Sequence, residues 1–185
     1  GICSLGISVD IVKDAAENAG LVIAQVNPQM PWTAPDGLVY VHDIDILVPA
    51  ETNLLEAALP VPTETSYRIA EYIAALIENG STLQIGVDNI SAALVKFLKN
   101  KHDLGIHSEV ITDTIIELVE SGIVTGLKKN TDRGKVVASF CIGTRMLYDY
   151  INNNPIFAIR STDHVSDPYL IKQHNKMVAL STAIE

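Results

Sequence analysis

The stretch Thr82-Leu-Gln-Ile-Gly-Val-Asp-Asn-Ile-Ser91 decides the fold. Its first four residues, mostly apolar or β-branched, predict a short strand; Gly86–Asn89 predicts a turn, and a helix is expected from about Ser91. A short strand followed closely by a helix is typical of a βαβ unit. The glycine turn would leave backbone N–H groups free at the carboxyl edge of the sheet, where open α/β sheets bind ligands.

The same alternation continues along the chain in both directions. Runs rich in β-branched residues alternate with segments of helical periodicity, which predicts an α/β fold with a mainly parallel sheet covered on both faces. The further expected strands are Leu21–Val26, Leu38–Val41, Ile44–Val48, Gly105–Ile111, Lys135–Phe140, Ile156–Arg160 and Met177–Ser181. The expected helices are Ile11–Ala19, Ser66–Asn79, Ser91–Lys99, Thr114–Ser121 and Thr144–Asn152.

The segment Pro49–Thr65 interrupts the alternation. It contains Pro60 and Pro62 and leads directly into the predicted helix Ser66–Asn79, so we expect a domain boundary near residue 60. The chain starts with Gly1 rather than Met and ends shortly after an apolar run. Both ends are therefore expected to be cut from something longer.

Composition excludes several classes of function. The 185 residues are 48% hydrophobic with a mean hydropathy of +0.23, which is typical of a packed globule rather than a disordered chain. A net charge of −9 and the lack of a Lys/Arg stripe argue against a nucleic-acid or anionic-membrane surface. The apolar runs are too short to cross a bilayer. Two distant cysteines favour neither a disulfide scaffold nor a thiolate metal site, so a cytoplasmic location is the default expectation.

Glu109 is the candidate chemical group. It lies near the end of the predicted strand Gly105–Ile111, at the same edge as the glycine turn if the two strands are neighbours. A carboxylate among apolar residues costs free energy unless it is paired, so the ordinary interpretation is a structural acid with a partner. The alternative is a carboxylate nucleophile, made effective by desolvation and by oxyanion-stabilising N–H groups of the Gly86–Val87 turn.

Other common chemistries have no motif here. The five histidines lack ligand spacing, so a metal site is not expected. No serine lies in a G-x-S-x-G context, and the turn has neither the G-x-G-x-x-G nor the Walker pattern. Lys96, Lys99 and Lys101 follow the turn and are interpreted as a solvated face, with contacts to a ligand phosphate as the alternative.

Several stretches, in family order and at family spacing, resemble the acetyl-CoA hydrolase/CoA-transferase family, of the 4-hydroxybutyrate and butyrate:acetate type. The resemblance runs from the first residue to the last. The stretches are Gly1–Asp10, Asn27–Pro31, Ser81–Gly86, Leu104–Glu109, Gly143–Asp149 with Asn153–Pro155, and Asp167–Tyr169 with Lys176–Val178.

The resemblance implies open, mainly parallel α/β sheets of the CoA-transferase type, in parts of two domains with the active site between them. Residues 1–60 would be the C-terminal part of the first domain plus a linker, and residues 61–185 the N-terminal part of the second domain with the nucleophile. That nucleophile would be Glu109, in the family segment G-I-H-[ST]-E. Because family chains are more than twice this length, the chain is not expected to turn over alone.

The resemblance also assigns roles around Glu109. The Val87 N–H beside Gly86 would stabilise the oxyanion and contact CoA, and the glutamate would form a covalent glutamyl-CoA thioester. Asn27, Met30 and Asn89 are the candidates on the substrate side. Coenzyme A or acyl-CoA would be the substrate, with no metal.

The implied reaction moves CoA between a short-chain acyl-CoA and a free carboxylate such as acetate. Hydrolysis of acyl-CoA, with water resolving the intermediate, is the alternative within the family. A non-catalytic CoA-binding or assembly domain is the alternative of another class, because Asp88 and Ser91 stand where the family has glycine and proline. A homo-oligomer, dimer or higher, is expected, with neither nucleic acid nor membrane as partner.

Overall fold

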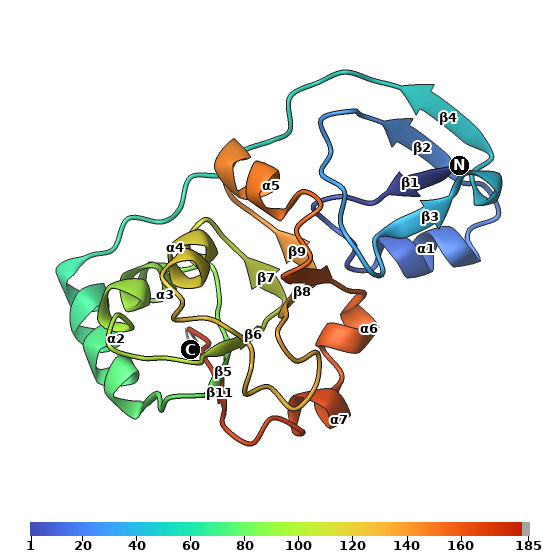
Figure 1. The fold of residues 1–185 in the computed structure, drawn as a ribbon. Helices are drawn as coiled ribbons and strands as arrows, with labels where there is room; N and C mark the ends of the chain where they lie inside the picture. Colours follow the sequence, from blue (N-terminus) through green and yellow to red (C-terminus); the bar gives the residue numbers. More distant parts are fainter. Residues whose placement is uncertain (183–185) are drawn as a thin grey trace.

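The computed structural model describes residues 1–182 and is built around one five-stranded parallel sheet (Figure 1). The spatial order of its strands is β10-β8-β6-β5-β11, and each neighbouring pair is parallel. The strands are β5 (Thr82–Gln84), β6 (Gly105–His107), β8 (Val136–Ala138), β10 (Phe157–Ile159) and β11 (Met177–Ala179). The predicted α/β class and parallel sheet are confirmed.

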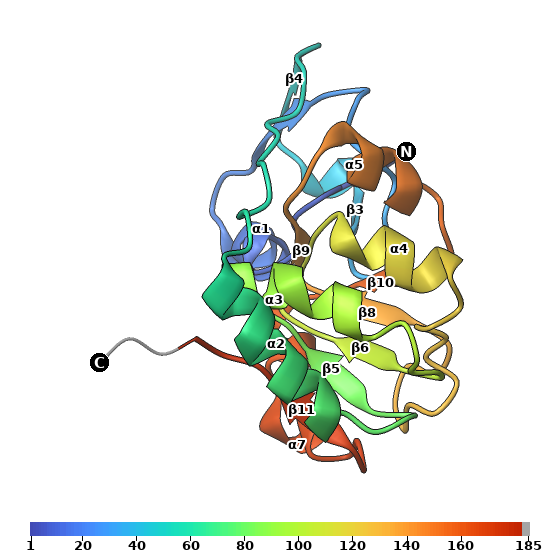
Figure 2. The same ribbon diagram turned by 90° about the vertical axis from the view of Figure 1, so that its left-hand side faces the viewer.

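Helices cover both faces of this sheet. Helices α2 (Glu64–Leu76), α3 (Asn89–Leu94, continued by a 3₁₀ turn at Val95–Phe97) and α4 (Thr114–Glu120) form a layer on one face (Figure 2). The short helices α6 (Thr162–Val165) and α7 (Pro168–Ile171) precede β11, and Val165 of α6 packs on the opposite face. Helix α5 (Arg145–Ile151) joins β9 to β10.

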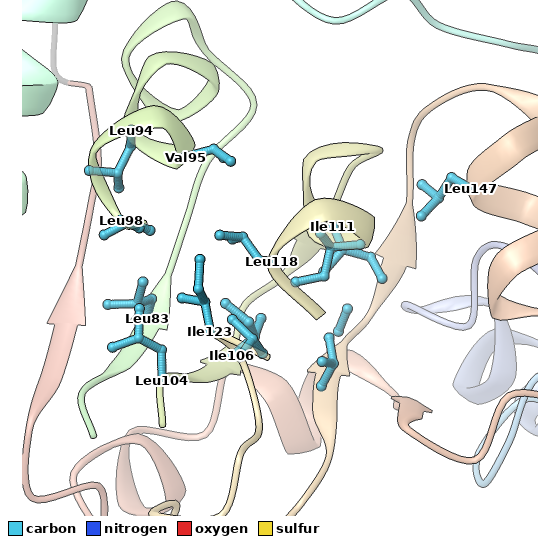
Figure 3. Packing of buried hydrophobic residues seen from close by; sticks show 14 of the residues in the cluster. Leu83, Leu94, Val95, Leu98, Leu104, Ile106, Ile111, Leu118, Ile123 and Leu147 are labelled. Atoms are coloured by element: carbon cyan, nitrogen blue, oxygen red, sulfur yellow. The ribbon is translucent and has the colours of Figure 1, made fainter. Parts of the chain in front are cut away.

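The main core lies between the sheet and the layer of α2, α3 and α4. Leu83, Ile106 and Val136 occupy matching positions on three adjacent strands and face this layer. Figure 3 shows Leu94 and Leu118 of the helices packed over them. These side chains are almost completely buried, and each such burial contributes about 1.5–3 kcal/mol to folding.

The N-terminal part carries two small sheets. Strands β1 (Ile2–Ser4) and β3 (Leu38–Tyr40) pair antiparallel, while β2 (Ile23–Val26) and β4 (Ile46–Pro49) pair parallel. Helix α1 (Val12–Asn18) lies beside them, and a 3₁₀ turn covers Val41–Asp43 (Figure 1). Several apolar side chains of the parallel pair are exposed, among them Ile23, Ile46 and Val48.

The N-terminal part contacts the main body through buried side chains and backbone hydrogen bonds. Val9 is fully buried in the main core, and Cys141 N donates to Ile7 O at 2.8 Å. The linker also binds the main body, since Tyr148 Oη donates to Leu55 O at 3.0 Å. A domain division near residue 60 stays a prediction.

The structure differs from the expected elements mainly at their ends. The predicted strand Gly105–Ile111 is two strands, β6 and β7 (Val110–Ile111), separated by Ser108 and Glu109. Strand β7 pairs with β9 (Phe140–Cys141), where the predicted strand Lys135–Phe140 is likewise divided. The chain leaves the sheet ladder at both points, so Glu109 is exposed rather than enclosed in a continuous strand. In the described part of the chain, no helix has the length and hydropathy that a membrane span needs.

Candidate functional site

A pocket of about 270 Å³ lies at the carboxyl ends of β5, β6 and β11. Three segments line it: residues 84–88 from the end of β5, residues 108–110 after β6, and residues 179–182 from the end of β11. The chain passes from β5 to β6 on one side and returns with β11 on the other, so the strand order reverses at β5. Ligands of open α/β sheets bind at such a reversal, outside the carboxyl ends of the strands.

Strands β5 and β6 are direct neighbours, as the hypothesis for Glu109 requires. Thr82 pairs with Gly105 and Leu83 with Ile106, in parallel register. The segments that follow these strands therefore meet at one edge, and Glu109 lines the same pocket as the Gly86–Val87 turn.

The backbone of Glu109 is fixed by hydrogen bonds, whereas its carboxylate makes none with the described residues. Its carbonyl oxygen accepts hydrogen bonds from Ser139 N at 2.9 Å and from Phe140 N at 3.1 Å. Its carboxylate has no hydrogen bond or ion pair with any residue between 1 and 182, and the residue is exposed. Residues 1–182 thus offer no partner for a purely structural carboxylate, and among them nothing occupies the two oxygens that face a ligand site.

The Gly86–Val87 turn presents amide groups at the pocket. The N–H groups of Gly86 and Val87 have no hydrogen-bond acceptor within residues 1–182. Val87 is 38% exposed, so its side chain does not seal the turn from the pocket. Free, fixed N–H groups can stabilise a developing oxyanion.

Asp88, which follows the turn, is the N-cap of α3. Its Oδ1 accepts hydrogen bonds from the N–H groups of Ile90 and Ser91, both at 2.8 Å. Its Oδ2 accepts a third from Ser91 Oγ at 3.1 Å. The carboxylate therefore caps the N-terminus of α3, although Asp88 also lines the pocket. An N-cap satisfies N–H groups that the first helical turn leaves without partners.

The three residues assigned to the substrate side do not line this pocket. Asn27 lies in the loop after β2, where its Nδ2 donates to Thr52 O at 2.7 Å. Met30 packs against Gly6, so closely that a Cβ there would collide with it. Asn89 is the first residue of α3 and is half-buried. Their contact with a substrate stays a prediction.

Two features of the pocket were absent from the sequence argument. Ser108 is 1% exposed, and its Oγ donates to Ile85 O at 2.8 Å and accepts from Ile85 N at 3.1 Å. Leu180–Thr182 form a third wall because β11 lies beside β5. Both the contact of Ser108 with Ile85 and the position of β11 depend on tertiary packing, so neither had a signal in the sequence.

Beneath this edge, on the sheet face away from α3, lies a cluster of buried polar groups. His107 is 1% exposed; its Nε2 lies 2.9 Å from Val165 O, and its Nδ1 has no partner in the described residues. A carbonyl can only accept, so Nε2 carries the proton and Nδ1 is a buried lone pair. Burial lowers the pKa of His107. The ring centroid of His174 lies 5.2 Å from that of His107, and burial lowers the pKa of His174 to about 4.

Lys129 and Asp132 complete the cluster. Lys129 Nζ donates to Ile106 O at 2.8 Å and to Lys135 O at 3.0 Å, and burial lowers its pKa to about 8. Burial alone would raise the pKa of Asp132, but hydrogen bonds from His164 and Arg160 hold it below its usual value. No arrangement of three or more His, Cys, Asp or Glu side chains suited to a metal ion occurs within residues 1–182.

The open parallel sheet defines an α/β protein, and the carboxylate and amide groups in the pocket at its reversal point form a candidate small-molecule site. Two family models match the chain. The acetyl-CoA hydrolase/transferase N-terminal domain matches residues 1–60, and the acetyl-CoA hydrolase/transferase C-terminal domain matches residues 143–185. The chain belongs to the acetyl-CoA hydrolase/transferase family.

Curated relatives and solved structures agree with this assignment. The chain is 45% identical over its whole length to the 4-hydroxybutyrate coenzyme A transferase of Clostridium kluyveri and covers 43% of that protein. It is 36% identical to a succinyl-CoA:acetate/propanoyl-CoA:succinate CoA transferase of Fasciola hepatica, of which it covers 39%. The crystal structure of 4-hydroxybutyrate CoA-transferase from Porphyromonas gingivalis matches 97% of the chain with a TM-score of 0.93 and 35% identity, over 46% of its own length. The chain thus spans less than half the length of these relatives.

Proposed function

We propose that the protein transfers CoA between a short-chain acyl-CoA and a free carboxylate, with Glu109 as the nucleophile. One observation carries the proposal. In a chain of this family, the carboxylate of Glu109 has no partner among the described residues, and it lines the same pocket as the unpaired N–H groups of Gly86 and Val87. A nucleophile and an oxyanion-stabilising pair are what acyl transfer needs.

The proposed reaction begins with attack of a Glu109 carboxylate oxygen on the thioester carbon of acyl-CoA. The negative charge that develops on the thioester oxygen is stabilised by the Val87 N–H. The C–S bond breaks, CoA leaves as a thiolate, and an acyl-glutamyl anhydride remains. The thiolate then attacks the glutamyl carbon of the anhydride, which expels the acyl carboxylate and leaves a glutamyl-CoA thioester. A second carboxylate repeats these steps in reverse and leaves as the new acyl-CoA.

The surroundings of Glu109 suit this chemistry. Its main chain is fixed by two hydrogen bonds from the β8–β9 segment, so its Cα position is set by the sheet. Glu109 and Val87, which line the pocket, are exposed, so a thioester can approach them from solvent. Asn27, Met30 and Asn89 remain proposed substrate contacts, which they would make outside this pocket. We further propose acyl-CoA and a carboxylate as ligands, a cytoplasmic location and a homo-oligomeric assembly, dimer or higher.

The first experiment is peptide mass mapping of the protein at its natural length after incubation with acetyl-CoA and no acceptor. The Glu109 peptide is expected to gain a CoA thioester in the wild type and none in Glu109→Gln. Glu117→Gln is the matched control, because Glu117 is an exposed glutamate on α4 that lies outside the pocket. A wild-type protein that binds acetyl-CoA without forming the adduct would be a CoA-binding or assembly domain instead.

A second assay separates transfer from hydrolysis. The protein is incubated with butyryl-CoA, with and without acetate, and the acyl-CoA products are measured. Transfer predicts acetyl-CoA formation that requires acetate. Release of free CoA at a rate independent of acetate would identify hydrolysis as the main activity.

A further inference from the structure

Ser108 connects the two halves of the candidate site. It follows β6, directly before Glu109, and its side chain reaches across to Ile85, directly before Gly86. Its Oγ donates to the carbonyl oxygen of Ile85 at 2.8 Å and accepts from the N–H of Ile85 at 3.1 Å. One hydroxyl thus satisfies both backbone groups of the residue that leads into the glycine turn.

The two hydrogen bonds of the Ser108 hydroxyl lie beyond the last backbone pairing between β5 and β6. The last paired residues of β5 and β6 are Leu83 and Ile106. Beyond them, within residues 1–182, no other hydrogen bond joins segment 85–88 to segment 107–110. The relative position of the turn and Glu109 therefore depends on the Ser108 hydroxyl and on packing.

Ser108 is itself firmly placed. Its N–H donates to Val137 O at 3.1 Å, and the next carbonyl, that of Glu109, accepts from Ser139 N at 2.9 Å. With 1% of its surface exposed, the side chain is also shielded from water, which would otherwise compete for the Ile85 groups. The hydroxyl is therefore a rigid connection from the β6–β8 pair to the turn.

We propose that Ser108 is a positioning residue that fixes the N–H groups of Gly86 and Val87 relative to the carboxylate of Glu109. This inference rests on the proposed function and deepens it. Ser108 acts through the turn and through the residue that follows it, without touching the reacting atoms. Small errors of position in such a site are costly, because a displacement of about 1 Å reduces rates by about 10²-fold.

The variants follow from the hydrogen bonds. Ser108→Ala removes the hydroxyl and leaves Ile85 N and Ile85 O unpaired, whereas Ser108→Thr keeps a hydroxyl on the same carbon. The matched control is Ser139→Ala. Ser139 is fully buried on the neighbouring chain segment, but its Oγ has no hydrogen-bond partner in the described residues, and its backbone N–H is kept in the alanine variant.

The test measures the rate of the Glu109 CoA adduct against acetyl-CoA concentration, in the protein at its natural length. Ser108→Ala is expected to lower the maximal first-order rate about 10–100-fold while the half-saturating concentration stays within about twofold. Ser108→Thr is expected to restore the rate to within about fivefold of wild type, and Ser139→Ala to leave it unchanged. Thermal melting checks that the variants are folded.

Three results would overturn the inference: an unchanged rate in Ser108→Ala, a Ser108→Thr variant as slow as the alanine variant, or an equal loss in Ser139→Ala. If the wild type forms no adduct, the proposed function fails and amide hydrogen exchange decides the positioning role. Faster exchange across residues 85–88 in Ser108→Ala, but not in Ser139→Ala, supports it. Equal exchange in the two variants refutes it.

Discussion

Ser91 donates two hydrogen bonds to Asp88, from its N–H to Oδ1 at 2.8 Å and from its Oγ to Oδ2 at 3.1 Å. These are the two positions where the chain differs from the glycine and proline of the family pattern. The structure shows that they act together, since Asp88 caps α3 and Ser91 holds both oxygens of the cap. The Asp88 carboxylate is thus part of the N-terminus of the helix that follows the turn.

The cap gives the first prediction. Asp88→Ala is expected to lower the free energy of unfolding by about 1 kcal/mol, the usual value of an N-cap, and to slow adduct formation at Glu109 because the turn before the helix loosens. Urea unfolding and the adduct assay measure the two effects. Asp167→Ala is the matched control, because Asp167 caps α7 through Tyr169 N at 2.7 Å, away from the pocket. A control that slowed the adduct equally would show that cap loss acts through global stability alone.

The second prediction concerns the Val87 N–H. Val87→Pro removes this donor and Val87→Ala keeps it, while both remove the same exposed side chain. The proline variant is expected to lose about 10²–10³-fold in the rate of adduct formation, the usual effect of deleting an oxyanion donor. The alanine variant is expected to stay close to wild type. Equal rates in two folded variants would remove the Val87 N–H from the mechanism.

The third prediction is a loss of stability in acid. The unfolded chain binds a proton on His174 near pH 6.5, whereas the buried side chain in the folded protein has a pKa of about 4. Between these values the unfolded state holds more protons, so the free energy of unfolding falls as the pH is lowered from 6.5 toward 4. His107, with its pKa lowered in the same direction, adds to the effect.

The acid effect is measured as the slope of unfolding free energy against pH. His174→Gln is expected to reduce this slope. Integrated from pH 6.5 to 4, the reduction corresponds to about 1–3 kcal/mol of unfolding free energy. His42→Gln, at a histidine whose side chain is 76% exposed, is expected to leave the slope unchanged. A slope that is the same in all three proteins would mean that other groups, not the buried histidines, govern the acid limit.

The fourth prediction is a gain of stability in alkali. The pKa of Lys129 is about 8 in the folded protein against an ordinary value of 10.5. From pH 8 to 10.5 the folded lysine has lost its proton while the unfolded one retains it, so the contribution of Lys129 to the unfolding free energy rises with pH. Lys129→Met is expected to abolish this rise. Lys128→Met, at an exposed neighbour, is expected to keep it, and a rise that persisted in Lys129→Met would contradict the assignment.

The sequence was a good guide to the strands and helices of the sheet. The runs Thr82–Ile85 and Ile156–Arg160 contain strands that are one or two residues shorter than predicted. β-branched and other apolar residues between turn signals favour strands in a buried sheet. Elements that were not predicted, among them β1, α6 and α7, have three or four residues each. Segments of that length are too short to show a periodicity.

The candidate site was predictable only in part. Strand-edge geometry placed Glu109 and the Gly86–Val87 turn at one edge only if their strands are neighbours; β5 and β6 are paired, and the two segments line one pocket. The order of the strands depends on tertiary packing, so neither the wall formed by β11 nor the bond from Ser108 to Ile85 could be read from local pattern. The substrate-side residues Asn27 and Met30 came from the resemblance alone, and the structure holds them in a loop away from this pocket.

The position of β11 beside β5 also determines at which point of synthesis the pocket can form. A ribosome delivers residues in order, at about 5–20 per second, so β5, β6 and Glu109 emerge well before the strand that supplies the third wall. A nascent or truncated polypeptide that stops before Met177 carries the carboxylate and the turn but lacks residues 179–182. The pocket around Glu109 is thus completed only when β11 emerges, after the other four strands of the sheet.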